Sequence, residues 1–382
     1  MLNIWTIFVT ALKLGLTSFG GPSAHIGYFQ QTYVKEKKWL TDKQYIDLVA
    51  LSQFLPGPAS SQVGMGIGLR KGGILGSLVA FIGFTMPSVI ILIIFVIFMK
   101  SSTINMDWLM GLKLVAVAVV AQAVFDMGKK IIVSKKHVIL LVLVLIGLYF
   151  SNSIFSQVIV IFSCGLIGLQ LFKHHNQTEY EPVFSKKWGA FSLLLFFVLL
   201  IGLPIIANIV SMDWIKLFSQ FFIAGSFVFG GGHVVLPLLE TQFVGTYVTA
   251  EEFLVGYGLT QAVPGPLFTF ASYLGMVIGG IPMAIMATIA IFLPAFLLIV
   301  GAYPFWAMLS RYAQLNGAIV GMNVAVIGIL LAAFISPIVS TTITSWIDGV
   351  FAFILLMLLS KFKWKPWIVV IAGIVIGVTY YR

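Results

Sequence analysis

Long apolar segments separated by short polar ones run through the whole chain. Segments of about 20 residues, the length that a helix needs to cross the hydrocarbon core of a bilayer, recur from residues 4–20 to residues 366–381. The first segment lacks a basic start and a small-residue cleavage site, so we interpret it as a span and not as a removed signal. The pattern predicts an all-α, polytopic membrane protein.

The apolar pattern of residues 52–68 is interrupted by Pro56-Gly57-Pro58. Two prolines remove two N–H donors and the glycine between them permits a sharp bend, so a continuous helix cannot pass. In hydrocarbon the freed backbone groups are tolerated only where protein or a cavity satisfies them. A half-helix that begins after the break offers free N–H groups and a positive dipole end, which favour an anion. A plain kinked helix or a surface turn is the alternative for a single motif.

The motif occurs a second time, at Pro264-Gly265-Pro266. Gln53 and Gln261 precede the two motifs at an offset of 261 − 53 = 208 residues. The repetition favours a shared design over a chance turn, and an internal repeat is common in secondary transporters.

Two histidines have the same offset, since 233 − 25 = 208 for His233 and His25. We therefore predict a first membrane repeat over residues 1–172 and a second over residues 210–382. A polar linker and an extra span, residues 173–209, join them.

Lysines in the short loops have opposite placements in the two predicted repeats. In the last hairpin of the first repeat, Lys135 and Lys173 flank the outer ends, whereas in the second repeat the tip carries Lys361, Lys363 and Lys365. Because cytoplasmic loops are rich in lysine and arginine, this pattern predicts two inverted-topology repeats with discontinuous, Pro-Gly-Pro broken helices.

The number of crossings depends on how the broken segments run. Counting each broken helix as one crossing predicts thirteen spans, but it places Lys35, Lys37 and Lys38 on the outer side. Re-entrant broken segments would lower the count and remove that conflict.

Composition narrows the class of protein. Hydrophobic residues make up 60% of the chain and charged residues 9%, whereas a soluble domain carries about 25% charged residues. The net charge of +10 is concentrated in short loops, so we interpret it as a determinant of topology and predict no nucleic-acid partner. The single Cys164 lies in an apolar run, which excludes a disulfide framework and a cysteine-based metal site. We predict no cofactor and no enzyme activity. The sequence contains no nucleotide-binding loop, so we predict that ATP does not drive transport directly.

Five ordered motifs in both repeats resemble the signature of the chromate transporter family in its long, two-domain form. They are FGGPSAHIGYF (19–29), LVALSQFLPGPASSQVGMGIG (48–68), GFTMP (83–87), FGGGHVVLPLLE (229–240) and GLTQAVPGPLFTFASYLG (258–275). The resemblance implies a transporter that exports chromate across the cytoplasmic (inner) membrane of a bacterium and confers chromate resistance. Sulfate has the same charge and shape and is the natural alternative substrate.

The polar residues inside the spans favour an anion. Acidic residues there are few, mainly Asp47, Asp126 and Glu240, whereas cation sites need oxygen ligands. A tetrahedral dianion needs several hydrogen-bond donors and a positive dipole. The predicted oxyanion-binding residues surround the two breaks and include both matched histidines: Gln53, Pro56, Gly57, Pro58, Ser60, Ser61, Gln62, His25, Gln261, Pro264, Gly265, Pro266, Thr269, Ser272 and His233.

Several of these residues have a structural alternative. Each histidine is either a structural hydrogen-bonding group or a donor and proton-coupling group. Gln53 and Gln261 either contact substrate or satisfy carbonyl groups freed by the break. Glu240 is a candidate for coupling to protons, and Lys113 is interpreted as snorkelling to the interface.

The function predicted from these observations is a secondary transporter that exports chromate or sulfate-like oxyanions, with the lipid bilayer as its surroundings and a homodimer left open. The alternatives are an uptake carrier for sulfate or another anion, an anion channel, and a membrane-embedded enzyme. The enzyme alternative lacks support because no HExxH motif or paired Asp-rich motif is present.

Overall fold

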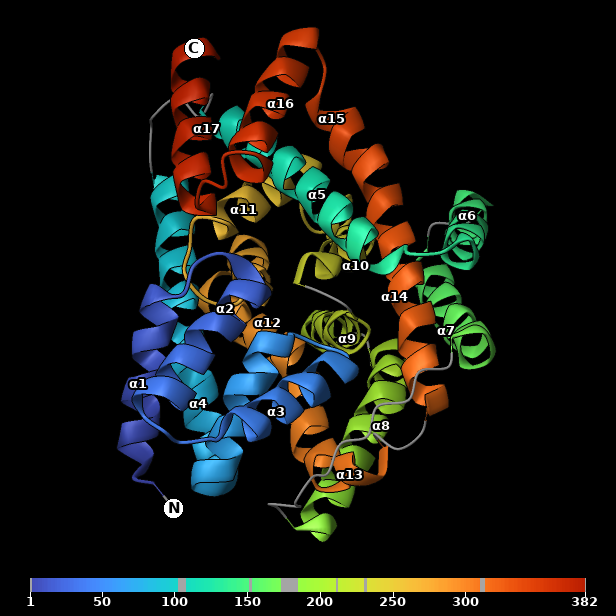
Figure 1. Ribbon diagram of the computed structural model, residues 1–382. Coiled ribbons are helices and arrows are strands. Elements are labelled where there is room, and N and C mark those ends of the chain that lie inside the picture. The colour runs from blue at the N-terminus through green and yellow to red at the C-terminus, as the bar shows by residue number, and fades with distance from the viewer. Residues whose placement is uncertain are drawn as a thin grey trace.

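The computed structural model describes residues 2–101, 108–150, 153–172, 185–210, 212–229, 232–309 and 313–381. These residues are almost entirely helical and contain no strand (Figure 1). Five helical segments among them are long and apolar enough to cross a membrane: Ala59–Ser101, Leu109–Ile131, Lys186–Ile209, Leu267–Phe305 and Asn316–Thr342. The prediction of an all-α, polytopic membrane protein is confirmed. The expected tip at residues 151–152 and most of the expected polar linker, residues 173–184, lie outside the described residues.

The helices of the first part of the chain alternate between short and long. They are α1 (Ile4–Thr17), α2 (Gly21–Phe29), a π-helical turn (Gln30–Glu36), α3 (Asp42–Phe54), α4 (Ala59–Ser101), α5 (Leu109–Ile131), α6 (Lys135–Phe150), α7 (Ile154–Leu171) and α8 (Lys186–Ile209).

The second part of the chain follows α8. Its elements are α9 (Asp213–Ser226), a 3-10 turn (Gly232–Val234), α10 (Val235–Phe243), α11 (Ala250–Thr260), a 3-10 turn (Leu267–Thr269), α12 (Phe270–Ala302), a 3-10 turn (Tyr303–Phe305), α13 (Trp306–Leu309), α14 (Ala313–Ala333), a π-helical turn (Phe334–Val339), α15 (Ser340–Thr342), α16 (Trp346–Ser360) and α17 (Pro366–Tyr380).

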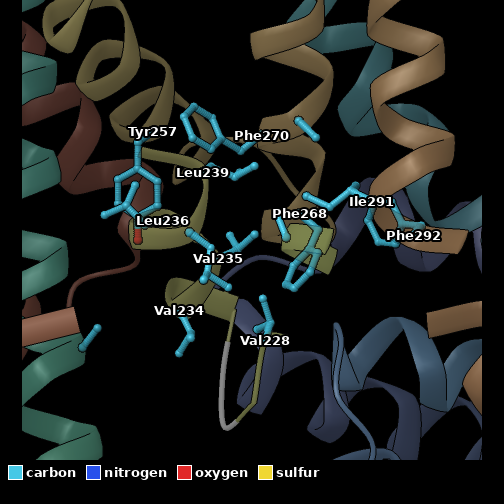
Figure 2. Packing of buried hydrophobic residues seen from close by; sticks show 14 of the residues in the cluster. Val228, Val234, Val235, Leu236, Leu239, Tyr257, Phe268, Phe270, Ile291 and Phe292 are labelled. Carbon is cyan, nitrogen blue, oxygen red and sulfur yellow. The ribbon is translucent and has the colours of Figure 1, made fainter. Parts of the chain in front are cut away.

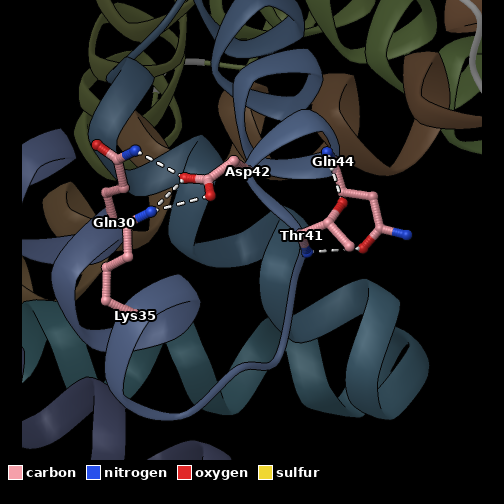
Figure 3. A network of polar contacts seen from close by, with 5 residues as sticks. All are labelled: Gln30, Lys35, Thr41, Asp42 and Gln44. Atoms are coloured by element: carbon pink, nitrogen blue, oxygen red, sulfur yellow. Dashed lines mark hydrogen bonds and ion pairs between the residues drawn. The ribbon is translucent and has the colours of Figure 1, made fainter.

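Equivalent helices α3 and α11 begin with the same local device. The hydroxyl of Thr41 accepts a hydrogen bond from the Gln44 amide, and the Gln44 side chain accepts one from the Thr41 amide (Figure 3). Thr249 and Glu252 form the same pair at the start of α11. Each of these reciprocal pairs, known as capping boxes, satisfies two of the amides that a helix start leaves free.

Asp42, the residue after Thr41, is bound to the π-helical turn that precedes α3. The carboxylate of Asp42 lies 2.9 Å from Lys35 Nζ and accepts a second hydrogen bond from Gln30 (Figure 3). The hydrogen bonds from Lys35 and Gln30 hold the pKa of Asp42 below its usual value. Because the pair is exposed, it positions the start of α3 more than it stabilises the protein.

Each Pro-Gly-Pro motif lies between two helices that pack side by side. In the first repeat α3 ends at Phe54 and α4 begins at Ala59, and a Cβ atom on Gly66 of α4 would overlap Leu48 of α3. In the second repeat the hydroxyl of Tyr273, on α12, donates to the carbonyl of Glu252, on α11, at 2.9 Å.

These contacts join positions on both sides of each motif, so the chain turns back on itself there. We name residues 42–71 hairpin 1 and residues 250–278 hairpin 2. The turns use a positive φ at Gly57 (116°) and Gly265 (103°), which glycine adopts readily. The structure therefore favours the re-entrant alternative over thirteen crossings.

The long helices α4 and α12 each contain a second reversal. Gly73 (φ 63°, ψ −155°) and Gly280 (φ 74°, ψ −162°) interrupt the helical backbone at equivalent places. This region of backbone conformation is essentially restricted to glycine. A Cβ atom on Gly68 would overlap the carbonyl oxygen of Gly76, so the two arms of α4 approach closely after the reversal.

The last helices of each repeat pack against the other repeat. In Figure 1, α5 lies beside α16 and α17, and α14 lies beside α7. Glycines permit these close crossings, since a Cβ atom on Gly111 would overlap the Gly373 carbonyl and one on Gly168 would overlap the Gly317 carbonyl. Close approach through small residues is how membrane helices gain packing contacts.

Apolar side chains of the second repeat form a buried cluster around α10 and the start of α12. Figure 2 shows Val228, Val235 and Leu236 facing Phe268 and Phe292, all of them almost fully buried.

We predict that Gly73→Ala lowers the stability of the protein. Alanine has room for its Cβ atom at this position, but its backbone disfavours the required φ and ψ at a cost of about 1–3 kcal/mol. The midpoint of thermal unfolding of the purified protein in detergent measures the effect. Gly202→Ala, in an open position of α8, is the control and should leave the midpoint equal or higher. Equal midpoints for both variants would contradict a glycine-only reversal.

Candidate functional site

The tip of each hairpin is hydrogen-bonded to the other repeat. The amide of Gly57 donates to the carbonyl of Val228 at 2.7 Å, and the amide of Gly265 donates to the carbonyl of Ser18 at 2.8 Å. Val228 and Ser18 occupy the same place in the two repeats, just before Phe229 and Phe19 and the glycines that follow them. The two bonds satisfy backbone groups that the breaks would otherwise leave unpaired in an apolar region.

Each tip also packs against a proline-containing stretch of the other repeat. A Cβ atom on Gly57 would lie 3.1 Å from the Cβ atom of Ala295, next to Pro294. A Cβ atom on Gly265 would overlap the hydroxyl of Ser88, next to Pro87. Both tips are buried, and glycine is required at each because the opposite helix approaches so closely.

Two adjoining cavities lie beside the tips. The hairpin-1 cavity has a volume of about 270 Å³ and is lined by Gly57 and Ala59 of hairpin 1. The hairpin-2 cavity has a volume of about 610 Å³ and is lined by Gln261 of hairpin 2. Pro22, Met127 and Gly232 line both cavities, so the two cavities adjoin each other between the two repeats.

The hairpin-1 cavity combines one positive charge with neutral polar groups. Lys130, at the end of α5, lines it together with Ser52, Gln53 and Asn323. The hydroxyl of Ser52 and the side-chain oxygen of Asn323 are buried without a hydrogen-bond partner among the described residues. Unpaired buried polar atoms indicate room for a polar ligand or water.

The N-terminus of α4 opens at this cavity. The first backbone bond of the helix runs from the amide of Gln62 to the carbonyl of Pro58, and the three preceding amides belong to the unpaired first turn. Ala59 at this end lines the cavity. The helix dipole and its free N–H groups therefore favour an anion there, and Lys130 adds a full charge.

The hairpin-2 cavity has a mixed charge. Asp126 of α5 and Lys363 of the loop between α16 and α17 both line it, as do Gln122 and His233. The opposite charges of Asp126 and Lys363 make this cavity less favourable for a dianion than the hairpin-1 cavity.

The structure distributes the predicted site residues unequally. Gln53 and Gly57 line the hairpin-1 cavity, and Gln261 and His233 line the hairpin-2 cavity. The other predicted residues do not line either of these two cavities: His25, Pro56, Pro58, Ser60, Ser61, Gln62, Pro264, Gly265, Pro266, Thr269, Ser272 and Glu240.

The side chain of Gln62 has a structural contact at the break. Its amide nitrogen donates to the carbonyl of Pro56 at 2.9 Å, so it satisfies a group that the two prolines leave free. In the second repeat, the hydroxyl of Thr269 donates to Pro266 and that of Ser272 donates to Thr269. These local hydrogen bonds occupy side-chain donors that we predicted to bind the substrate.

The matched histidines have different partners. His25 Nδ1 lies 3.3 Å from the hydroxyl of Ser60, and His233 Nδ1 lies 2.6 Å from the hydroxyl of Tyr257. Both contacts join a histidine to the hairpin of its own repeat. Lys113 also differs from the snorkelling interpretation, because its Nζ forms a 2.9 Å ion pair with Glu251 at the start of hairpin 2.

Lys130, the cationic residue that lines the hairpin-1 cavity, was not predicted as a site residue. Lys130 was assigned to a loop with other lysines, as a determinant of topology, although it ends α5. Asn323 carried a stronger signal, since an isolated amide inside an apolar helix is commonly functional.

The comparisons with known proteins agree with one another. The sequence model of the family described as chromate transporter matches residues 5–169 and 215–378. An uncharacterized transporter of Methanocaldococcus jannaschii is 30% identical over 97% of this chain and 93% of its own length. Chromate transport proteins of Cupriavidus metallidurans and Pseudomonas aeruginosa are each 26% identical, over 97% and 86% of this chain and 91% and 80% of their own lengths. No solved structure matches the chain.

We predict that Gln62→Leu destabilises hairpin 1. The substitution leaves the buried carbonyl of Pro56 without its side-chain donor, which costs about 1–3 kcal/mol. The thermal unfolding midpoint of the purified protein measures the loss. Ser61→Ala is the matched control, because the hydroxyl of Ser61 has no hydrogen-bond partner to lose among the described residues. An unchanged midpoint for Gln62→Leu, together with weakened oxyanion binding, would assign Gln62 to the substrate instead.

Proposed function

The chain belongs to the chromate transporter family, and from this premise we propose that it is a secondary transporter that exports chromate or sulfate-like oxyanions. It is a multi-pass membrane protein, and we place it in the cytoplasmic membrane of a bacterium. We propose transport and not catalysis, because the polar groups of the two cavities suit the binding of an anion and the family is one of transporters.

The observation that carries this proposal is the start of α4 at the hairpin-1 cavity. A tetrahedral dianion would meet the free amides of the first helical turn at Ala59 and the ammonium group of Lys130. Gln53 and Ser52 supply neutral donors beside them. Several hydrogen-bond donors and one full positive charge are enough to bind a dianion reversibly, as transport requires.

The proposed site therefore shifts from the hydroxyls after the break to the groups before and around it. Ser60 is engaged with His25, whereas Gln53 is exposed to the cavity. The matched Gln261 faces the adjoining cavity, which makes it a candidate for a second position of the anion along its path.

The lysines support an orientation in which both cavities open to the cytoplasm. Lys130 lies at the end of α5, five residues before α6, and Lys363 lies three residues after the end of α16. The cavities that they line adjoin each other. Helices α6 and α16 are equivalent in the two repeats, so the start of one lies near the end of the other, as inverted repeats require. Clustered lysines assign this side to the cytoplasm.

Export of a dianion from a cell with a negative interior is favoured by the membrane potential. Moving two negative charges outward gains about 4.6 kcal/mol per 100 mV, twice the value for one charge. A carrier with its cavities open to the cytoplasm would bind the anion there and release it outside, without a nucleotide.

We predict that Lys130→Gln weakens chromate binding. Removing one charged contact costs about 1.5–3 kcal/mol, which is roughly ten- to hundredfold in affinity. Uptake of labelled chromate into inside-out vesicles under imposed potentials measures the change, and labelled sulfate tests the alternative substrate. Lys129→Gln is the control, since Lys129 lines neither of the two cavities. Equal effects of both substitutions would remove Lys130 from the site, and flux that no gradient drives uphill would indicate a channel.

We predict that Lys135 and Lys363 face the same side of the membrane. In a Cys164→Ser background, which removes the single cysteine, Lys135→Cys and Lys363→Cys should each react with an impermeant thiol reagent in inside-out vesicles only. Labelling of the two positions from opposite sides would contradict the inverted arrangement.

A further inference from the structure

Three buried hydroxyl groups near the tip of hairpin 2 have no role in the site described above. Ser18, Thr85 and Ser88 are exposed by 0%, 1% and 1%, and none of their hydroxyl oxygens has a hydrogen-bond partner among the described residues. Burying an unpaired hydroxyl is costly, and such groups in a folded protein require an explanation. None of the three lines either cavity.

Two of these residues contact Gly265. Its amide donates to the carbonyl of Ser18, and a Cβ atom on Gly265 would overlap the hydroxyl of Ser88. Thr85 precedes Ser88 by three residues in α4, so the two side chains share one face of the helix.

Backbone oxygen atoms complete the same region. A Cβ atom on Gly265 would lie 3.4 Å from the carbonyl oxygen of Phe84. Pro87 has no N–H group, so the carbonyl of Gly83, four residues earlier, lacks its usual helical donor. The carbonyls of Gly83 and Phe84 both face Gly15 of α1.

The helix dipole at this point has the sign that favours a cation. Helix α1 ends at Thr17, with Ser18 as its C-cap, and the C-terminal end of a helix carries partial negative charge. Carbonyl and hydroxyl oxygens are the ligands of hard cations. The ligands here are all neutral, which suits a single positive charge better than a divalent ion, and carbonyl oxygens of interrupted membrane helices coordinate Na⁺ in other transporter folds.

We propose that Ser18, Thr85 and Ser88, beside the tip of hairpin 2, together bind one Na⁺ ion. The described residues contain no group of three or more His, Cys, Asp or Glu side chains that could hold a metal ion, so this site differs in kind from a divalent or transition-metal site.

The second repeat lacks the equivalent oxygens. Ala295 takes the place of Ser88 beside the tip of hairpin 1, and Val228, which occupies the place of Ser18 and bonds that tip through its carbonyl, has no hydroxyl group. The tip of hairpin 1 therefore makes the same contact without these unpaired hydroxyls, and we propose no ion there. The fold does not require these hydroxyls, and the protein has a single site of this kind among the described residues.

The proposed ion would link cation and anion binding. It joins the end of α1 and helix α4 to the tip of hairpin 2 at Gly265, four residues after Gln261, which lines the hairpin-2 cavity. An ion that holds this tip in place changes the affinity for the anion, and the anion changes the affinity for the ion by the same factor. This consequence rests on the proposed function, whereas binding of Na⁺ does not.

The test compares the thermal stability of the purified, full-length protein in NaCl, KCl and N-methylglucamine chloride at equal ionic strength, with no oxyanion present. A ligand that binds the folded protein raises its unfolding midpoint in a saturable way. We expect Na⁺ to raise the midpoint by at least about 2 °C over the other two cations. The rise should be lost in Ser88→Ala, which copies the second repeat, and in Thr85→Val.

Ser77→Ala is the matched control. Ser77 also lies on α4 with a buried, unpaired hydroxyl, but it is about 16 Å from Ser88 along the helix, and the variant should keep the Na⁺-specific rise. No rise in the unmodified protein, or equal loss in Ser77→Ala and Ser88→Ala, would overturn the proposal and leave the hydroxyls to bound water. If Ser88→Ala does not fold, Thr85→Val decides. If the protein shows the Na⁺-specific rise but transports neither chromate nor sulfate in the vesicle assay, the proposed function is rejected and the cation site is kept.

Discussion

The structure depends on the rule that backbone polar groups inside a bilayer must find partners within the protein. Each Pro-Gly-Pro motif breaks a helix at a position surrounded by apolar residues, and the breaks are tolerated because the opposite repeat supplies the missing partners. The amides of Gly57 and Gly265 bond to the carbonyls of Val228 and Ser18, and Gln62 bonds to the carbonyl of Pro56. These bonds make each repeat incomplete without the other.

This dependence also explains where the cavities lie. The tips cannot be covered by their own repeat, so they meet the glycine-rich turns that precede α2 and α10, and the space beside those turns is only partly filled. Ligand sites in transporters built from repeats commonly lie at the interface between the repeats. Adjoining cavities between the two repeats are the arrangement that alternating access would need.

The two repeats share one design but differ in chemistry. Beside its tip, the second repeat has Gly265 facing the hydroxyl of Ser88, whereas the first has Gly57 facing the methyl group of Ala295. In the second repeat, no residue at the place on α14 equivalent to Lys130 lines the hairpin-2 cavity. A symmetric scaffold with unequal polar groups allows one repeat to hold a ligand that the other does not, and our two proposals assign the anion and the cation to different sides of this asymmetry.

The sequence by itself determined the helical, membrane-embedded class, the two breaks, and the matched positions of Gln53 and Gln261. These follow from local chemistry: apolar length, missing N–H donors and residue spacing. Only the tertiary structure decided that the broken segments fold back as hairpins, that Ser60 and Thr269 are engaged within their own repeat, and that Lys130 faces a cavity. The reason is that these outcomes depend on contacts between residues far apart in the chain, such as Gly57 with Val228, and local spacing carries no information about which distant carbonyl or helix end comes near.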